Sequence, residues 1–431
     1  MNPAILVLSP LAILLTGIVL QGLLAGILTP RGKGWLALAT GLGAFASVIA
    51  VWPTILAGHI LDVSLMHWDG PAQIAFHVDG LSLLFALMAT GIGTAVLLYS
   101  VTYMELEKGT TRFYALVLVF IAGLMNLVYT ADIFLFYASW ELVGLCSFLL
   151  VGFWYTNPDS AYGARKVFTM THIAGYGLLV AVVLIYVRTG STLWTDPRVQ
   201  AAFTSGIFIL VLISAIAKSV QFPLHTWIPF AMYAPTPVSA LLHAAVYVKC
   251  GVYLVARLRS LHAWPESWSS TVAWIGAITL LVGVLFALAQ TDLKKLLAFH
   301  TVSQIGYMML GLGLGTPLAI AAGLFHCLNH GLFKGTLFLC AGAVQHACGG
   351  TRDMHRLGGL GRRMPYTMMI WLVAAASIAG LPLLNGFASK WLLFNAAISA
   401  HQPLLALVPW VGSIFTTFSF LKATNGVFLG S

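Results

Sequence analysis

Long apolar runs repeat along the whole chain, and short polar linkers separate them. A run of about 20 apolar residues is long enough to cross a bilayer as a helix. Counting such runs predicts thirteen membrane-spanning helices in one all-α integral membrane domain. We expect them near residues 5–29, 35–56, 80–101, 113–130, 133–153, 167–187, 203–228, 237–256, 270–290, 296–314, 317–345, 366–398 and 405–426. The first run lacks a preceding basic segment and is long enough to span, which indicates a transmembrane helix rather than a cleaved signal peptide.

The predicted spans contain an internal repeat. Spans four to eight resemble spans nine to thirteen, and the fourth member of each set is interrupted by proline and carries a lysine. The first reads AKSVQFPLHTWIP, with Lys218, and the second reads AGLPLLNGFASKW, with Lys390. Because each set has an odd number of spans, the two sets cross the membrane in opposite directions. This predicts two inverted five-helix repeats, each with one broken helix, over residues 112–259 and 260–431, preceded by three helices in residues 1–111.

Composition supports a membrane protein. The chain has 431 residues, of which 60% are hydrophobic and 8% charged, and its mean hydropathy is +0.94. A soluble domain carries about 25% charged residues. The net charge of +9 does not indicate nucleic-acid binding, because the basic residues occupy short loops without an aromatic-rich basic patch.

The loop charges predict an orientation, because cytoplasmic loops are enriched in lysine and arginine. One set of loops holds Arg31, Lys33, Lys108, Arg112, Arg165, Lys166, Lys294, Lys295, Arg352, Arg356, Arg362, Arg363 and Lys422. The other set holds only Arg188, Arg198, Arg257 and Arg259. We therefore expect the N-terminus outside and the C-terminus in the cytoplasm.

Five ionisable residues fall within the apolar runs, and they are Glu141, Lys218, Lys249, Lys334 and Lys390. A charge at the centre of a bilayer costs about 2.5–3.5 kcal/mol on insertion scales, so such residues usually have a function. Glu141 needs a cation, and we expect Lys218 to supply it. Changing their separation would move Lys218 between its charged and neutral forms, which makes a proton switch. The alternative is a structural ion pair.

Histidines extend this row of titratable groups. His243 and Lys249 lie on the eighth predicted span, and His326, His330 and Lys334 share one face of the eleventh because they are spaced four residues apart. An HxxxH pair could hold a metal, but an HExxH glutamate is absent, so a proton relay is the better interpretation. We assign Lys390 to the end of the row.

The remaining polar motifs favour simpler interpretations. His172 and His300 are expected near span ends, with interfacial hydrogen bonds. The five cysteines form no CxxC pair and are interpreted as small buried residues. The sequence has no GxGxxG, P-loop, CxxC or haem-attachment motif, so no cofactor, metal or nucleotide is expected within this chain.

The same residues resemble a known family. VDGLSLL, WELVGLCSFLLVGF, AKSVQFPLHTWIPFAMYAPTPVSALLHAAVYVKCGVYL, DLKKLLAFHTVSQIGYM, FHCLNHGLFKGTLFL and GLPLLNGFASKW resemble the antiporter-like membrane subunits of complex I, Mrp cation/proton antiporters, membrane-bound hydrogenases and inorganic-carbon uptake complexes. The resemblance implies that Glu141 modulates Lys218, that protons pass laterally between half-channels, and that the chain works in a multisubunit complex of a bacterial inner membrane.

The chain departs from the family pattern in two places, and the resemblance also implies partners. Related complex I subunits carry an acid on the sixth span where this chain has Gly175, beside His172, and the family core usually has a fourteenth helix. LPLLNGFASK and GTRDM resemble the Mrp or hydrogenase branch. Possible partners are a redox module, Mrp-type subunits or a zinc carbonic-anhydrase-like protein, with protons or Na⁺ as the ion. The alternatives to proton translocation are a role in energised carbon uptake and that of a non-conducting structural anchor.

Overall fold

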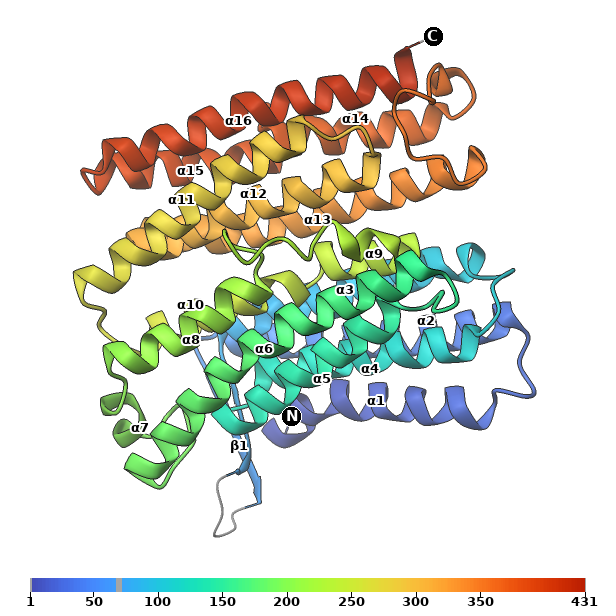
Figure 1. Ribbon diagram of the computed structural model, residues 1–431. Helices are drawn as coiled ribbons and strands as arrows, with labels where there is room; N and C mark the ends of the chain where they lie inside the picture. Colours follow the sequence, from blue (N-terminus) through green and yellow to red (C-terminus); the bar gives the residue numbers. More distant parts are fainter. Residues whose placement is uncertain (1, 67–71, 431) are drawn as a thin grey trace. The chain divides into compact units, whose positions relative to one another are not determined.

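The computed structural model describes residues 2–66 and 72–430, and helices account for most of them. The chain divides into two compact units. Unit 1 comprises Met1–Lys218 and Ala245–His262, and unit 2 comprises Ser219–Ala244 and Ala263–Ser431. Figure 1 follows the elements along the chain, from α1 to α16.

Unit 1 contains the first eight α-helices, a β-hairpin and the helix α10. Its elements are α1 (Pro3–Leu23), α2 (Pro30–Leu56), β1 (Leu61–Met66), β2 (Ile74–Val78), α3 (Gly80–Tyr103), α4 (Thr110–Tyr129), α5 (Ile133–Val151), α6 (Pro158–Thr189), α7 (Pro197–Ala201), α8 (Ser205–Lys218), the 3₁₀ turn η2 (Tyr247–Lys249) and α10 (Cys250–Leu261). Strands β1 and β2 pair antiparallel.

Unit 2 contains the remaining helices. They are the 3₁₀ turn η1 (Phe230–Tyr233), α9 (Thr236–Ala244), α11 (Glu266–Leu288), α12 (Leu293–Leu314), α13 (Pro317–Ala347), the 3₁₀ turn η3 (Leu360–Arg362), α14 (Pro365–Ala379), α15 (Asn385–Ser399), α16 (Pro403–Thr424) and the π-helical turn η4 (Asn425–Leu429).

Each predicted apolar run contains a helix, and the helices of the runs 203–228 and 366–398 are interrupted as predicted. Ten helical segments are long and apolar enough to cross a membrane, and α8 and α14 are shorter apolar helices. Helix α8 ends at Lys218, and the chain runs irregularly to η1. Helix α14 stops before Gly380, whose φ of 90° suits glycine, and α15 begins at Asn385. The all-α membrane fold with broken helices is therefore confirmed, whereas the number thirteen stays a prediction.

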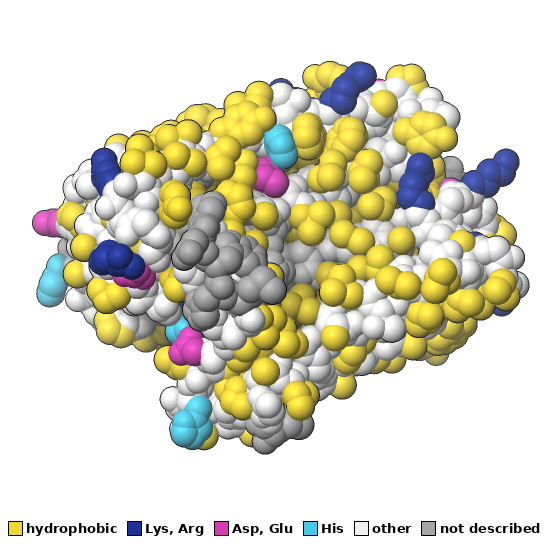
Figure 2. Space-filling model, turned by 90° about the horizontal axis from the view of Figure 1, so that it is seen from below, with side chains coloured by type: hydrophobic (Ala, Val, Ile, Leu, Met, Phe, Trp, Pro, Cys, Tyr) yellow, Lys and Arg dark blue, Asp and Glu magenta, His cyan; other side chains and the backbone are white. Residues whose placement is uncertain are grey.

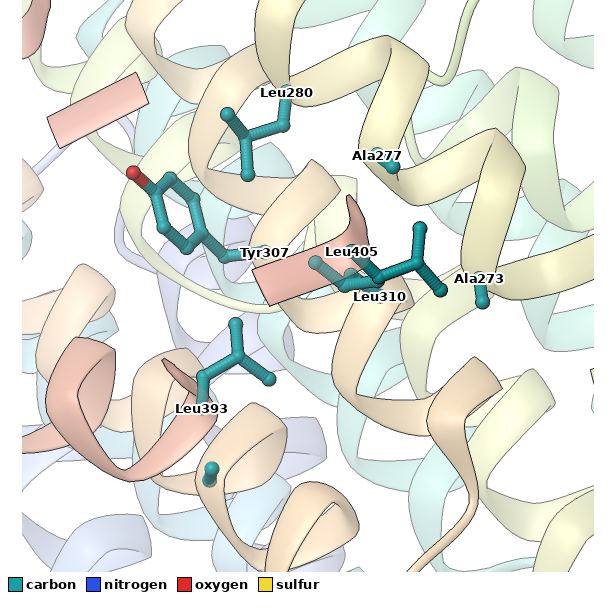
Figure 3. Packing of buried hydrophobic residues seen from close by; sticks show 8 residues of the cluster. Ala273, Ala277, Leu280, Tyr307, Leu310, Leu393 and Leu405 are labelled. Atoms are coloured by element: carbon teal, nitrogen blue, oxygen red, sulfur yellow. The ribbon is translucent and has the colours of Figure 1, made fainter. Parts of the chain in front are cut away.

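Close backbone contact holds α11 against α12 in unit 2. A Cβ atom at Gly306 would lie 2.6 Å from the carbonyl oxygen of Gly276, so only glycine permits this approach. Beside this contact, Ala273, Ala277, Leu280, Tyr307, Leu310, Leu393 and Leu405 form a buried apolar cluster (Figure 3).

The outer surface is largely apolar. Leu15, Val19 and Leu23 on α1 are each more than half exposed. Figure 2 shows hydrophobic side chains over most of one face, with few charged side chains among them. Burying polar groups inside and presenting apolar ones outside is what lipid as a solvent requires. The chain is a multi-pass integral membrane protein.

Candidate functional site

Glu141 lies on α5 in unit 1 and pairs with a histidine. Its Oε2 atom forms an ion-pair contact with Nδ1 of His172, which lies in the middle of α6. Its Oε1 atom is buried and has no hydrogen-bond partner among the described residues. A Cβ atom at Gly175 would collide with Oε1, so the missing side chain at that position leaves space for the carboxylate. The carboxylate thus keeps one free oxygen that could accept a proton.

This contact corrects the interpretation of His172 as an interfacial group at a span end. The side chain is 26% exposed, and its ring stacks on Phe168 with the centroids 4.4 Å apart. The stacking and the ion pair fix the ring toward α5. Gly175 stands close to His172 in the sequence, but only the packing of α6 on α5 shows that both face Glu141.

Lys218 is the last residue of α8 and is 1% exposed. Its Nζ atom donates to the carbonyl oxygen of Trp140 over 2.5 Å and lies 4.4 Å from the centroid of the Trp140 ring. The Tyr247 ring is 5.4 Å away. Two aromatic faces and a carbonyl can hold a buried ammonium without a carboxylate in direct contact.

Glu141 and Lys218 share a space without touching directly. Among the described residues they form no ion pair. A Cβ atom at Gly144 would lie 3.5 Å from Nζ of Lys218 and 3.9 Å from Oε2 of Glu141. Gly144 therefore keeps open the gap that separates the two groups. Glu141 therefore contacts His172 and lies across this gap from Lys218.

The eighth predicted span is broken between its two ionisable residues. Helix α9 ends at Ala244, one residue after His243, and η2 then carries Lys249 before α10 begins. The predicted span is still present, because Thr236–Leu261 as a whole is long and apolar enough to cross a membrane, but its helix is interrupted. His243 belongs to unit 2 and Lys249 to unit 1. Lys249 is fully buried, and its Nζ donates to the carbonyl oxygen of Ala245 over 2.6 Å.

In unit 2, His243 and Lys334 lie around one aromatic ring. His243 Nδ1 is 3.0 Å from the hydroxyl of Thr301 on α12, and its ring is 4.8 Å from that of Phe338 on α13. Nζ of Lys334 lies 5.9 Å from the Phe338 ring and donates to the carbonyl oxygen of Leu297 over 2.8 Å. Both ionisable side chains are fully buried.

A second pair, His326 and Lys390, lies around Tyr307. His326 contacts the Ser389 hydroxyl through Nδ1 at 2.9 Å and Oε1 of Gln304 through Nε2 at 3.1 Å. Its ring is 5.3 Å from the Tyr307 ring, and Nζ of Lys390 is 5.0 Å from the same ring.

Lys390 also contacts the end of α14. Its Nζ donates to the carbonyl oxygen of Ile378 over 2.7 Å, within the last turn of that half-helix. Because the C-terminal end of a helix carries partial negative charge, this end of α14 attracts a lysine ammonium. The broken helix therefore supplies a backbone site for the lysine.

His330 lies between these two groups on α13. It is fully buried, and its ring meets that of Phe333 edge to face at 5.6 Å. His326, His330 and Lys334 are all buried, since none is more than 1% exposed. Within residues 2–66 and 72–430, no three histidine, cysteine or acidic side chains gather as metal ligands would.

Three buried polar residues were not expected from the sequence. Lys294 was assigned to a loop, but it is 1% exposed and donates to the carbonyl oxygen of Ala234 over 2.9 Å. His300 was placed near a span end, but it is fully buried and lies 2.7 Å from the Ser419 hydroxyl. Both lie within the first eight residues of α12, close to the preceding loop, and their distance from the middle of the run weakened their signal.

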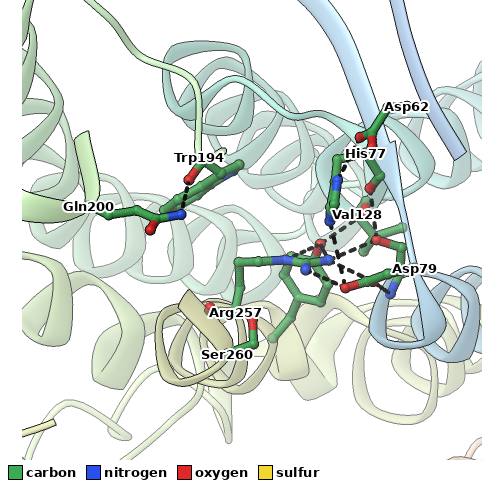
Figure 4. A network of polar contacts seen from close by, with 10 residues as sticks. Asp62, His77, Asp79, Val128, Trp194, Gln200, Arg257 and Ser260 are labelled. Carbon is green, nitrogen blue, oxygen red and sulfur yellow. Dashed lines mark hydrogen bonds and ion pairs between the residues drawn. The ribbon is translucent and has the colours of Figure 1, made fainter. Parts of the chain in front are cut away.

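The third of these residues is Arg257, which was counted as a loop arginine. It is 3% exposed and binds Asp79 through both terminal nitrogens, at 2.6 and 2.9 Å. Figure 4 shows this pair beside His77, which contacts Asp62 of the hairpin at 2.7 Å. The network fastens the hairpin and α3 to α10.

The fold and the buried row of ionisable groups define a class: multi-pass membrane proteins with lysines at broken helices. Within it, the chain belongs to the family described as "NADH:quinone oxidoreductase/Mrp antiporter, TM", which matches residues 130–416. Residues 69–114 match "NADH-Ubiquinone oxidoreductase (complex I), chain 5 N-terminus".

Several relatives are similar over nearly the whole chain. A probable K⁺/H⁺ antiporter subunit of Rhizobium meliloti is 39% identical over 92% of this chain and 41% of its own length. A Na⁺/H⁺ antiporter subunit of Alkalihalophilus pseudofirmus is 39% identical over 92% of this chain and 53% of its own length. The chain thus spans about half the length of these relatives.

Two solved structures share the fold. A chain of the Mrp complex from Dietzia sp. DQ12-45-1b aligns with a TM-score of 0.85 and 33% identity, over all of this chain and 47% of its own. A chain of the membrane-bound sulfane sulfur reductase, an archaeal respiratory membrane complex, aligns with a TM-score of 0.87 and 30% identity, over 99% of this chain and 70% of its own.

Proposed function

We propose that this chain is a proton-translocating subunit of a multisubunit membrane complex, and that it exchanges protons for a monovalent cation together with its partners. The observation that carries the proposal is the Glu141 carboxylate, which lies beside His172 and faces Lys218 across the gap at Gly144. The Glu141 carboxylate thus has two alternative cationic partners, whereas a static structural ion pair would need only one.

The chemistry of the switch follows from charge. When the carboxylate approaches Lys218, its attraction favours the protonated ammonium, and when the carboxylate returns to His172 this attraction weakens. At about 4 Å and an effective dielectric of about 20, two unit charges attract by about 4 kcal/mol. Lys218 then releases its proton. His243, Lys249, His326, His330, Lys334 and Lys390 are the further groups that we assign to proton transfer.

The identity of the cation and the partners rests on relatives. The two relatives above are called K⁺/H⁺ and Na⁺/H⁺ antiporter subunits, and the Dietzia structure is of an Mrp complex. These names favour Mrp-type subunits as partners over a redox module or a carbonic-anhydrase-like protein. They also favour cation/proton exchange over carbon uptake.

To test this proposal, Lys218 is replaced in the complete complex. The complex is reconstituted into liposomes that contain a pH-sensitive dye, which reports proton movement. Lys218→Ala should abolish cation-driven proton movement while the complex still assembles. Lys218→Arg should also fail, because arginine keeps the charge but does not release its proton. Lys108→Ala is the matched control, since that lysine is exposed, and it should transport normally.

Two outcomes would contradict the proposal. If Lys218→Arg transports at the wild-type rate, proton exchange at this residue is unnecessary. If Lys218→Ala and Lys218→Arg both remove the complex from the membrane, the lysine acts as a structural anchor.

A further inference from the structure

A groove opens between α4, α5 and α6 at one end of unit 1. Its volume is about 480 Å³, and it is lined by residues that include Arg112, Leu116, Phe148, Leu149, Ala161 and Arg165. The start of α4, the end of α5 and the start of α6 meet there, because consecutive helices run antiparallel. Ala161 and Gly152 leave room beside the larger apolar side chains.

The groove lies at the depth of lipid headgroups. Helix α6 has 32 residues, which corresponds to about 48 Å at 1.5 Å per residue. The hydrocarbon core of a bilayer is only about 30 Å thick, so the ends of α6 extend into the headgroup layers. Arg165 lies in the N-terminal third of this helix, and Arg112 lies in the first turn of α4. Leu116, Phe148 and Leu149 line the groove toward the membrane interior.

The two arginines at the groove carry uncompensated charge. Neither forms an ion pair with an acidic side chain among the described residues. Arg112 donates to the carbonyl oxygen of Phe153 over 2.8 Å, and its guanidinium carbon lies 5.1 and 5.2 Å from the Phe153 and Tyr155 rings. These contacts fix the guanidinium and leave other N–H groups available.

We propose that this groove binds one anionic phospholipid. The phosphate oxygens would accept hydrogen bonds from Arg112 and Arg165, a geometry in which arginine excels. One acyl chain would lie along Leu116, Phe148 and Leu149. A free phosphate ion would leave the apolar half of the groove empty, whereas a phospholipid matches both the charge and the apolar wall.

The groove adjoins the candidate site through aromatic contacts. Phe148 lies 5.2 Å from the Phe168 ring, and Phe168 stacks on His172, the partner of Glu141. A lipid in the groove would therefore pack against Phe148, which contacts Phe168 and through it His172, the partner of the Glu141 carboxylate. The lipid inference itself stands apart from the proposed function, because its test measures bound lipid rather than transport.

The experiment compares lipid retention by native mass spectrometry. The assembled complex is released from nanodiscs of phosphatidylethanolamine with a minor share of phosphatidylglycerol. The variant Arg112→Gln with Arg165→Gln should lose one phosphatidylglycerol per copy of the chain, with at least a tenfold fall in occupancy. The control Arg188→Gln with Arg198→Gln removes the same charge at exposed sites elsewhere and should retain the lipid.

A second variant tests the cavity with the charges intact. Ala161→Phe should fill the groove and also reduce phosphatidylglycerol retention, even if the arginine variant does not assemble. Equal retention by wild type and Ala161→Phe would overturn the proposal. Equal retention of phosphatidylethanolamine and phosphatidylglycerol by the wild type would also overturn it. Cross-linking of Leu149→Cys to another protein of the complex would overturn it as well, because a protein helix would then occupy the groove.

Discussion

At the scale of single residues, small side chains define the candidate site as much as charged ones do. Gly144 and Gly175 face Glu141 from α5 and α6; a side chain at Gly175 would occupy the space of the carboxylate, and one at Gly144 would enter the gap between the carboxylate and Lys218. His172 provides the ion pair that we expected from Lys218. The residues around one carboxylate thus decide which cation it contacts.

Gly144→Ala tests the gap directly. The added methyl would lie 3.5 Å from Lys218 Nζ and 3.9 Å from Glu141 Oε2, which is ordinary van der Waals contact, so folding should be preserved. It would block the movement of the carboxylate, and we expect proton transport in liposomes to fall about tenfold, which is about 1.4 kcal/mol in barrier. Gly22→Ala, where no atom lies within 4 Å of the new Cβ, is the control. Unchanged transport in Gly144→Ala would show that the gap is not used.

His172→Gln tests the alternative partner. In acid His172 becomes an imidazolium, which would hold Glu141 away from Lys218. Wild-type transport should therefore decline toward acid pH, and the glutamine variant should lose much of this decline. The measurement is the pH profile of transport between about pH 5 and 8. A variant that lowers transport equally at every pH would assign His172 a purely structural role.

At the scale of elements, buried polar contacts fasten helices to one another where apolar packing alone does not select a position. The Asp79–Arg257 pair joins the start of α3 to α10. Burial raises the pKa of Asp79, but the hydrogen bonds and charge of Arg257 outweigh it and lower the pKa to about 2. Because this pKa lies below the ordinary value of 3.8, the stabilisation is fully present above about pH 4 and is lost as the pH falls through about 2.

Arg257→Ala should destabilise the complex by about 3 kcal/mol, because it leaves a largely buried carboxylate without its partner. Burial would then raise the pKa of Asp79, so the loss of stability in acid should begin at a higher pH. Arg257→Lys keeps the charge but not the two parallel hydrogen bonds, and should lose less. Thermal unfolding of the complex at several pH values measures both effects, with Arg198→Ala, at a 69% exposed side chain, as control. Equal melting temperatures for wild type and Arg257→Ala would contradict the structural role.

At the scale of the whole molecule, the distribution of loop charges predicts an orientation. With the N-terminus outside, His59 is expected outside and Leu106 in the cytoplasm. Both are exposed, and Leu106 is 91% exposed. Four of the five cysteines are buried and only Cys348 is partly accessible, so Cys348→Ser gives a suitable background.

In this background, His59→Cys should react with a membrane-impermeant maleimide in intact cells. Leu106→Cys should react only after permeabilisation, because lysine- and arginine-rich loops stay in the cytoplasm. The opposite labelling pattern would invert the predicted orientation.

The amino-acid sequence by itself determined the membrane class, the apolar runs that hold the long helices, the two proline-broken helices and the four buried lysines within those runs, Lys218, Lys249, Lys334 and Lys390. These follow from local properties, since run length, proline and charge act on the chain wherever it packs. Tertiary structure alone decided that Glu141 meets His172, that Lys294 and Arg257 are buried, and that the chain breaks between His243 and Lys249. Each depends on which helix faces which, and apolar runs of similar composition do not specify their neighbours.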